Sequence, residues 1–212
     1  MLQMQKTMNE KVNPDWKNKG WSFLRAAMVE GVEAMEHRGW KWWKKQTCDL
    51  PQLQMEYVDI WHFALSDLML NNPEKSLEEI AEIVSMQIGA KNDLVVADGQ
   101  SFIISKMNEL EKMDIMIGLA AFKRFSIPLF ESLMKDAELD WNILYRQYVG
   151  KNALNIFRQN NGYAAGHYIK IWQGREDNEH LQEIVNELSW EESNPFIILT
   201  QKLEERYHAL NI

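Results

Sequence analysis

The sequence is poor in the residues that cross-link or interrupt a chain. It contains one cysteine, five prolines and ten glycines among 212 residues. A single cysteine, Cys48, excludes an intrachain disulfide and a cysteine-rich zinc site. The few prolines and glycines leave long segments without helix breakers. A chain of this length buries a sufficient core without covalent staples.

Long hydrophobic runs and an excess of basic residues are also absent. No apolar stretch approaches the roughly 18 residues of a membrane span, and the first residues lack the apolar segment of a secretory signal. Lys and Arg number 23 against 31 Asp and Glu, which gives a net charge of −8. Proteins that bind nucleic-acid polymers normally carry a basic stripe instead. We therefore expect a cytoplasmic protein that binds neither a membrane nor a nucleic-acid polymer.

Apolar residues that recur every three or four positions predict an almost entirely helical chain. Strand patterns bounded by Asn-Gly or Asp-Gly turns are scarce. Helix ends are marked by a capping box at 76–79, by Gly39 and by the Asn72-Pro73 pair. Residues 162–177 are expected to form a loop. The expected helices cover about 22–38, 51–70, 76–88, 101–124, a short segment after Pro128, 140–160, 178–188, and a last one from Pro195 behind Ser193 or Asn194.

Two carboxylates interrupt a segment that is otherwise expected to be buried. Residues 55–70 read MEYVDIWHFALSDLML, and their apolar side chains cover almost the whole circumference of a helix, as in a buried helix. Glu56 and Asp59 lie three residues apart and so share a face. Buried neighbouring carboxylates must be protonated, paired with basic groups or bound to cations. The alternative is that this face reaches the solvent, which is the commoner meaning of such a pair. His62 is expected to be a core residue or a neighbour of the site.

The preceding helix repeats this arrangement. Glu30 and Glu33 lie three apart among small and apolar residues, and Gly31 between them favours the close approach of another helix or of a ligand. Consecutive long helices joined by a short connection pack antiparallel, so the two acid pairs are expected to converge. Ligands that offer only oxygen favour Mg²⁺, with Mn²⁺ as the alternative ion. The sequence therefore predicts a site for Mg²⁺ or Mn²⁺, formed by Glu30, Glu33, Glu56 and Asp59.

A cationic stretch lies at residues 151–178, which read KNALNIFRQNNGYAAGHYIKIWQGREDN. Lys151, Asn155 and Arg158 share one helical face. A glycine-containing loop follows, whose N–H groups can approach an anion. Lys and Arg suit phosphate, and an Asn amide suits the edge of a base. The plainer alternative is a solvated helix end followed by a solvated loop.

Three segments together resemble the dimeric, all-α dUTPases. They are GWKWWKKQT at 39–47, EYVDIWHF at 56–63 and the cationic stretch at 151–178. The resemblance runs from about Gln5 to Asn178 and is most specific in the last segment, because the acid pairs are shared across the all-α nucleotide pyrophosphohydrolase superfamily. It implies a single all-α domain over 1–212, with a core at about 5–178 and C-terminal helices at about 178–210. The implied architecture is a helical bundle around a four-helix metal-binding core.

The resemblance also implies a reaction and a set of contacts. A homodimer would hydrolyse dUTP and dUDP to dUMP with two or more Mg²⁺ ions, and would release pyrophosphate from dUTP. The four carboxylates correspond to the family's metal motif, and Glu33 would also orient or deprotonate the attacking water. The contacts to uracil and to the nucleoside correspond to Gln5, Asn9, Asn155 and Trp43. The phosphate contacts correspond to Lys151, Arg158, Tyr163, Lys170 and Asn178.

Two stretches depart from the family, and two other functions stay open. Ala164 and Ala165 stand where many relatives carry a Lys, and residues 90–101 correspond to no part of the family. A related house-cleaning pyrophosphohydrolase, acting on dCTP or a modified nucleotide, would keep the metal site and differ only in its base pocket. A non-catalytic helical binding module would leave the acids solvated and would bind a partner through Trp-rich faces.

Overall fold

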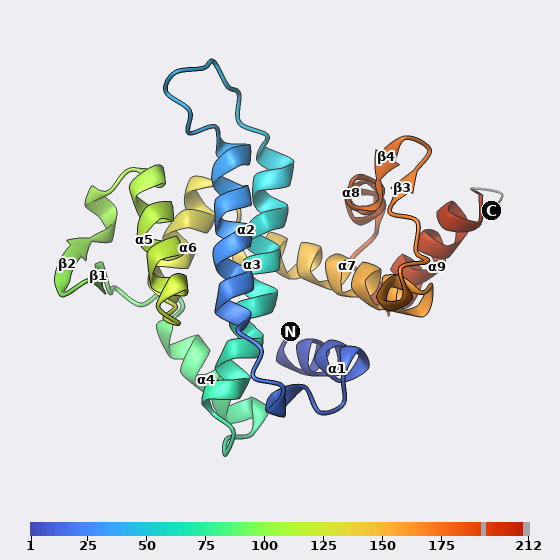
Figure 1. Ribbon diagram of the computed structural model, residues 1–212, viewed down its shortest axis with the longest axis horizontal. Helices are drawn as coiled ribbons and strands as arrows, with labels where there is room; N and C mark the ends of the chain where they lie inside the picture. The colour runs from blue at the N-terminus through green and yellow to red at the C-terminus, as the bar shows by residue number, and fades with distance from the viewer. Residues whose placement is uncertain (192–193, 210–212) are drawn as a thin grey trace. The chain divides into compact units, whose positions relative to one another are not determined.

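The computed structural model describes residues 1–191 and 194–209, and helices dominate it (Figure 1). The expected all-α class is confirmed. Two small antiparallel hairpins are also present, β1 (Leu94–Ala97) with β2 (Gln100–Ile103) and β3 (Ile171–Trp172) with β4 (Arg175–Glu176). The helices are α1 (Leu2–Val12), α2 (Phe23–Arg38), α3 (Leu50–Asn71), α4 (Leu77–Gln87), α5 (Glu109–Ala121), α6 (Ile127–Asp136), α7 (Trp141–Asn160), α8 (Asp177–Glu187) and α9 (Pro195–His208).

The chain divides into two compact units, which are described separately. The central unit contains Lys17–Asp140 and therefore α2 to α6 with the first hairpin. The terminal unit contains Gln3–Trp16 and the residues from Trp141 onward, and therefore α1 and α7 to α9 with the second hairpin. The expectation of one domain over 1–212 stays a prediction.

In the central unit, α2 and α3 lie side by side and antiparallel, and α5 packs against α2 (Figure 1). The sequence of α3 predicts burial on most sides, and this is confirmed, since Tyr57, Val58, Ile60 and Trp61 are fully buried. The ring of Trp61 stacks on that of Phe130 from α6, with centroids 5.4 Å apart. Among the residues that the structure describes, no helix has both the length and the apolarity that a membrane crossing requires.

Gly31 lies where α2 and α5 approach each other. A Cβ atom at this position would lie 2.9 Å from Cγ1 of Ile117 on α5. Any larger residue would therefore force the two helices or the Ile117 side chain to shift. The expected close approach of another helix at Gly31 is confirmed, and it holds the helix that carries Glu30 and Glu33 against its neighbour.

Several helix ends lie where the sequence predicts them. Gly39 ends α2 in the left-handed conformation, with φ 83°, which favours glycine. Ser76 and Glu79 form the capping box of α4, and Pro128 occupies the first turn of α6. Asn194 is the N-cap residue of α9, whereas Ser193 lies outside the described residues.

The prediction of a helix over 101–124 is wrong for its first residues. Residues 100–103 form β2, a 3₁₀ turn follows at Ile104–Lys106, and α5 begins only at Glu109. The cause is the Asp98-Gly99 pair, which takes φ values of 46° and 71°. Positive φ at both central residues is the requirement of the type I′ hairpin turn, and Asp-Gly meets it. Helix α1 was likewise not predicted, and 3₁₀ turns at Trp16–Asn18 and Tyr163–Ala165 complete the elements.

In the terminal unit, α7 packs against α8 and α9. Aromatic rings fill the space between them: Phe157 of α7 meets Tyr207 of α9 edge to face at 5.4 Å and Trp172 of β3 at 6.1 Å. Tyr168 stacks on Tyr207 with centroids 5.4 Å apart. Residues 162–177, expected as a loop, therefore contain the short second hairpin and contribute rings to this core.

Asp67, near the C-terminal end of α3, gives the central unit a pH-dependent stability. Burial raises the pKa of its carboxyl group to about 6, although the Asn71 amide donates a hydrogen bond to it at 2.8 Å and Lys123 favours its charge. The folded state thus binds this proton more tightly than the unfolded chain does. The stabilising contribution is fully present below pH ~4 and is lost as the pH rises through ~6.

We therefore expect Asp67→Asn to be more stable than the wild type at pH 8, by roughly 1 kcal/mol because the group is only partly buried. The difference should shrink toward zero near pH 4, where the wild-type carboxyl group is protonated. Urea unfolding of both proteins at the two pH values measures it. An equal difference at both pH values would contradict the assignment.

Candidate active site

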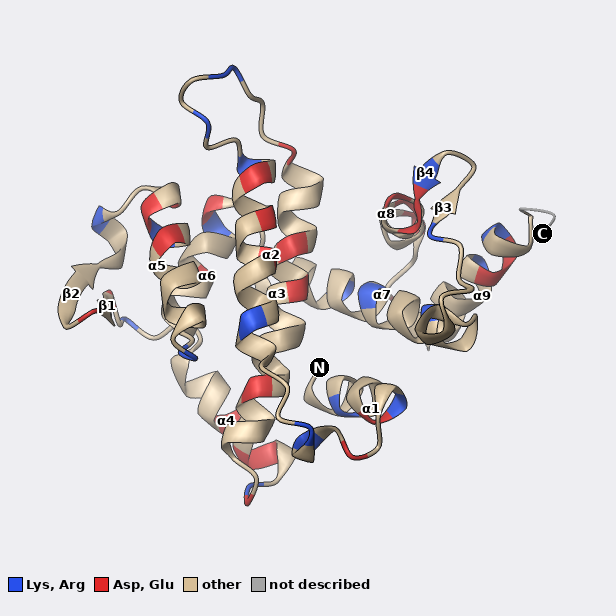
Figure 2. Cartoon of the chain, in the orientation of Figure 1, with Lys and Arg blue, Asp and Glu red and all other residues tan. Residues whose placement is uncertain are grey.

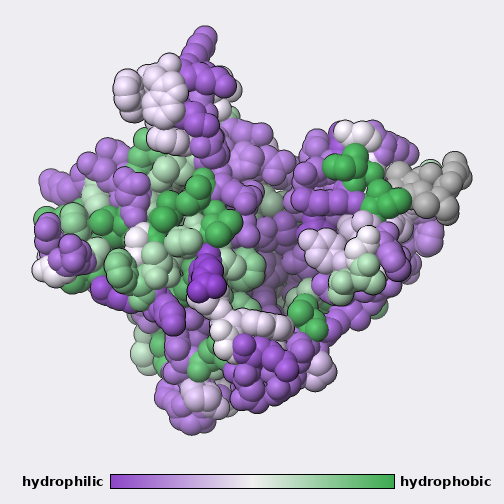
Figure 3. All heavy atoms as spheres, in the orientation of Figure 1, coloured by the Kyte–Doolittle hydropathy of each residue, from purple (hydrophilic) through white to green (hydrophobic). Residues whose placement is uncertain are grey.

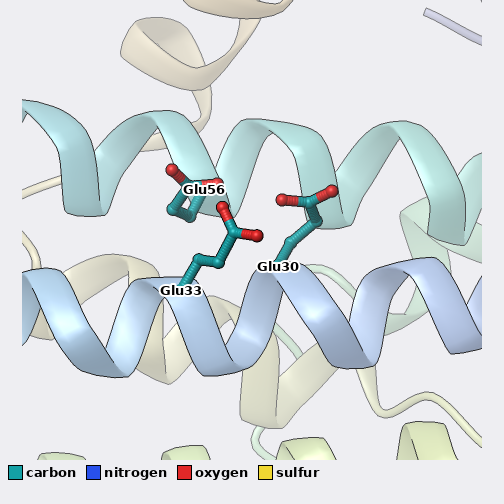
Figure 4. A group of neighbouring side chains, drawn as sticks. All are labelled: Glu30, Glu33 and Glu56. Carbon is teal, nitrogen blue, oxygen red and sulfur yellow. The ribbon is translucent and has the colours of Figure 1, made fainter.

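Three carboxylates converge between α2 and α3 in the central unit. Glu30 and Glu33 reach from α2 toward α3, where Glu56 lies (Figure 4). Each residue offers an oxygen atom, and the three atoms lie within 4.8 Å of one another. Glu56 is buried, with 8% of its surface exposed, whereas Glu30 is half-buried and Glu33 is exposed. The cluster thus combines a buried carboxylate on α3, Glu56, with a solvent-exposed one on α2, Glu33.

Asp59 lies three residues beyond Glu56 on α3 and is half-buried. It does not belong to the group whose oxygen atoms lie within 4.8 Å of one another. The structure therefore brings three of the four expected ligands together, and the role of Asp59 stays a prediction. The cluster comes from two helices, so the four-helix metal-binding core also stays a prediction.

His37 is a neighbour of the carboxylates that the sequence reasoning missed. Its Nε2 lies 3.6 Å from Oε1 of Glu56. His37 follows Glu33 by four residues on α2, and this spacing, which places both on one helical face, is the signal that was available. The next residue, Arg38, pairs with Glu109 of α5 and fixes the end of α2. His62, by contrast, is buried on α3, in agreement with the expected core position.

The donor set fits a hard divalent cation. Acidic residues occupy successive turns of α2 and α3 (Figure 2). Carboxylates this close repel one another, and the burial of Glu56 adds to the cost of its charge. Oxygen ligands without cysteine are the set that Mg²⁺ and Mn²⁺ prefer. A divalent cation between Glu30, Glu33 and Glu56 would neutralise this repulsion.

In the terminal unit, four of the residues expected to bind nucleotide form one hydrogen-bonded network. Arg158 Nη1 donates to Oδ1 of Asn155 at 3.2 Å, and Arg158 Nη2 donates to Oδ1 of Asn178 at 3.4 Å. Lys151 Nζ donates to the same oxygen of Asn178 at 3.1 Å. Three of these residues lie on α7, and Asn178 lies in the first turn of α8. The helical face predicted for Lys151, Asn155 and Arg158 is therefore confirmed.

Asp177 is the second residue that the sequence reasoning missed. Its carboxylate is fully buried and accepts two hydrogen bonds from Arg158, from Nε at 2.8 Å and from Nη2 at 2.7 Å. Tyr168 donates a third from its hydroxyl at 2.8 Å. Burial and the nearby Asp177 carboxylate raise the pKa of Tyr168, so its hydroxyl remains a donor. The sequence signal available for this residue was the presence of an acidic side chain within the cationic stretch, where it could pair with a basic one.

Gln5 and Asn9 are buried on α1 and face each other. Gln5 Nε2 donates to Oδ1 of Asn9 at 3.0 Å, and Tyr148 of α7 donates from its hydroxyl to Oε1 of Gln5 at 2.9 Å. Each polar group thus fixes the orientation of the next. Such an ordered pair of amides is suited to reading the edge of a base.

The other expected contacts lie on exposed segments. Tyr163 is 47% exposed, and its ring lies 5.9 Å from Cζ of Arg158. Lys170 is exposed and pairs with Glu176 at 3.2 Å. Trp43 is 57% exposed in the loop between α2 and α3, where its ring meets those of Trp40 and Trp42 edge to face.

Comparison with known proteins identifies a family for the chain. A protein-family model described as dUTPase matches residues 1–163, a span that includes the carboxylate cluster, Lys151, Asn155 and Arg158. A search of curated proteins gave no match. The family match covers well over half of the 212 residues, and it confirms the resemblance noted in the sequence. The chain belongs to the dUTPase family, and its activity is that of a dUTP diphosphatase.

Proposed function

We propose that the protein hydrolyses dUTP, and also dUDP, to dUMP with Mg²⁺ held by Glu30, Glu33, Glu56 and Asp59. The observation that carries the proposal is the convergence of three carboxylates from α2 and α3, with oxygen atoms within 4.8 Å of one another, in a chain of the dUTPase family. A triphosphate substrate is strongly negative, so an acidic protein needs cations to bind it.

We assign different roles to the three carboxylates according to how deeply each is buried. When bound, the cation neutralises charge on the phosphates and acidifies a water molecule. We assign Glu56, buried on α3, as the anchoring ligand, because a carboxylate attracts a cation more strongly where solvent screens it less. Glu33 is the exposed member of the cluster, so we assign to it the orientation of the attacking water and the acceptance of its proton. Glu30, half-buried beside it, completes the cluster.

The residues of the terminal unit are proposed to bind the nucleotide. Cationic and polar donors suit phosphate oxygens, and guanidinium and ammonium groups also neutralise the charge that develops during hydrolysis. Amide groups suit the pyrimidine edge, and an exposed Trp ring suits the nucleoside. We assign the phosphates to Lys151, Arg158, Tyr163, Lys170 and Asn178, and the nucleoside to Gln5, Asn9 and Asn155. The resemblance assigns Trp43 to the nucleoside as well.

We also propose that the enzyme is a homodimer of the cytoplasm. Apolar side chains gather on the face that α2 and α5 present (Figure 3). Val29 and Val32 of α2 are 44% and 48% exposed. A second copy of the chain would cover such a face, as obligate dimers do. The single, exposed cysteine, Cys48, suits a reducing compartment.

A panel of nucleotides tests the proposed reaction. With Mg²⁺, the purified protein should release pyrophosphate from dUTP and phosphate from dUDP, and should leave dCTP and dTTP nearly untouched. A chelator such as EDTA should abolish both activities. Equal turnover of all the nucleotides would overturn the assignment of uracil. Saturable binding of a non-hydrolysable dUTP analogue without any turnover of dUTP would favour a binding module instead.

A further inference from the structure

The side-chain amide of Asn155 is held in one orientation. Its Oδ1 accepts a hydrogen bond from Arg158 Nη1 at 3.2 Å. A guanidinium carries only donors, so the opposite orientation would set the Nδ2 amino group against another donor. Nδ2 is therefore directed away from Arg158. Because Asn155 is half-buried, this N–H donor can be presented to a ligand.

The orientation of Asn155 depends on a guanidinium that is itself fixed. The buried carboxylate of Asp177 accepts from both Nε and Nη2 of Arg158, at 2.8 Å and 2.7 Å. Two parallel hydrogen bonds hold a planar guanidinium in a single plane. The hydroxyl of Tyr168 donates to the same carboxylate at 2.8 Å and keeps it in place. Nη1 of the same guanidinium donates to Oδ1 of Asn155.

We propose that Asp177 is a positioning residue for base selection, which acts by fixing Arg158 and thereby presenting Asn155 as a donor to position 4 of the pyrimidine. The inference rests on the proposed function. Uracil carries a carbonyl oxygen at position 4 and accepts such a donor, whereas cytosine carries an amino group there. Two opposed donors leave a desolvated polar group without a partner, so cytosine is rejected.

The same network joins base reading to phosphate binding. Arg158 and Lys151 both donate to Oδ1 of Asn178. Arg158 thus connects Asn155, assigned to the base, with two residues assigned to the phosphates, and Asp177 fixes the group at the centre. A change at Asp177 should therefore alter the choice between substrates as well as the overall rate.

The substitution Asn155→Asp tests the orientation directly. Aspartate would still accept from Arg158 with one oxygen, and would present its other oxygen, an acceptor, to the base. We expect the ratio of kcat/KM for dUTP to kcat/KM for dCTP to fall by about 100-fold. Equal losses for both substrates would leave the ratio unchanged and would place Asn155 on the O2 atom that uracil and cytosine share. That result would overturn the proposal.

The substitution Asp177→Asn tests the positioning role, with Asp15→Asn as its matched control. Asp15→Asn makes the same chemical change at an exposed position of the terminal unit, outside the network that holds Arg158. We expect the dUTP-to-dCTP ratio to fall by about tenfold in Asp177→Asn and to stay within twofold of the wild type in Asp15→Asn. The ratio, measured on one preparation, does not depend on the folded fraction, so a merely structural defect would leave it unchanged.

The outcomes separate this inference from the proposed function. A wild type that hydrolyses dUTP and excludes dCTP, with an unchanged ratio in Asp177→Asn, would overturn the positioning role and leave the enzyme assignment intact. Absence of dUTP hydrolysis by the wild type would overturn both. If Asp177→Asn yields no folded protein, Asp177→Glu makes the same test, because its longer side chain displaces the carboxylate that holds Arg158; an unchanged ratio in that variant overturns the positioning role.

Discussion

Replacing Glu56 with Gln is expected to lower Mg²⁺-dependent hydrolysis of dUTP on the order of a thousandfold. Gln has nearly the same shape as Glu, so the packing around this buried position on α3 is retained. The substitution removes the negative charge that anchors the cation beside Glu30 and Glu33. Initial rates of pyrophosphate release at saturating Mg²⁺ measure the loss, and the far-UV circular dichroism spectrum should remain that of the wild type.

Glu82→Gln provides the matched control for this experiment. It makes the same chemical change on α4 of the central unit, at an exposed position outside the cluster. We expect its rate to stay within about twofold of the wild type, since exposed substitutions away from a site rarely alter it. A Glu56→Gln enzyme that kept more than a tenth of the wild-type rate would show that the cluster is not the metal site.

Replacing Phe130 with Ala is expected to destabilise the protein by about 3–5 kcal/mol. Phe130 is fully buried on α6 and stacks on Trp61 of α3. Its ring also meets those of Tyr57, at 6.1 Å, and Phe125, at 5.5 Å. Truncation leaves a cavity that these large rings cannot close. Denaturant unfolding monitored by circular dichroism measures the change.

The control for this stability experiment is Phe122→Ala, which deletes the same ring from a surface position. Phe122 follows α5 and is 81% exposed. We expect its free energy of unfolding to lie within about 0.5 kcal/mol of the wild type. Equal effects of the two substitutions would contradict the arrangement of α3 and α6 around Phe130. This core matters for function because α3 also carries Glu56.

The sequence was most informative where local rules decide the structure. The ends of α2 and α4 follow from Gly39 and from the Ser76–Glu79 capping box, whose effects depend only on neighbouring residues. The convergence of Glu30, Glu33 and Glu56 could also be predicted, since two long helices joined by a short loop must pack antiparallel. The first hairpin was missed although Asp98-Gly99 is a strong local turn signal.

The partners of the site residues could not be predicted in the same way. Asp177 meets Arg158 from another helix, 19 residues along the chain, and the spacing between them carries no helical period. The pairing of Arg38 with Glu109 spans 71 residues. Such contacts depend on how helices pack, which a single sequence does not specify. The solvent exposure of Glu33 and Trp43 could not be predicted either, because burial follows from tertiary packing.

Binding of Mn²⁺ alone, followed by electron paramagnetic resonance, tests most directly whether the α2–α3 cluster holds the cation. Titrated with wild-type protein, the signal of free Mn²⁺ should fall as the ion binds, and Mg²⁺ in excess should restore it. Glu56→Gln should leave most of the signal at protein concentrations that suffice for the wild type, and Glu82→Gln should match the wild type. Equal Mn²⁺ binding by the wild type and Glu56→Gln would contradict the assignment of the cluster as the metal site.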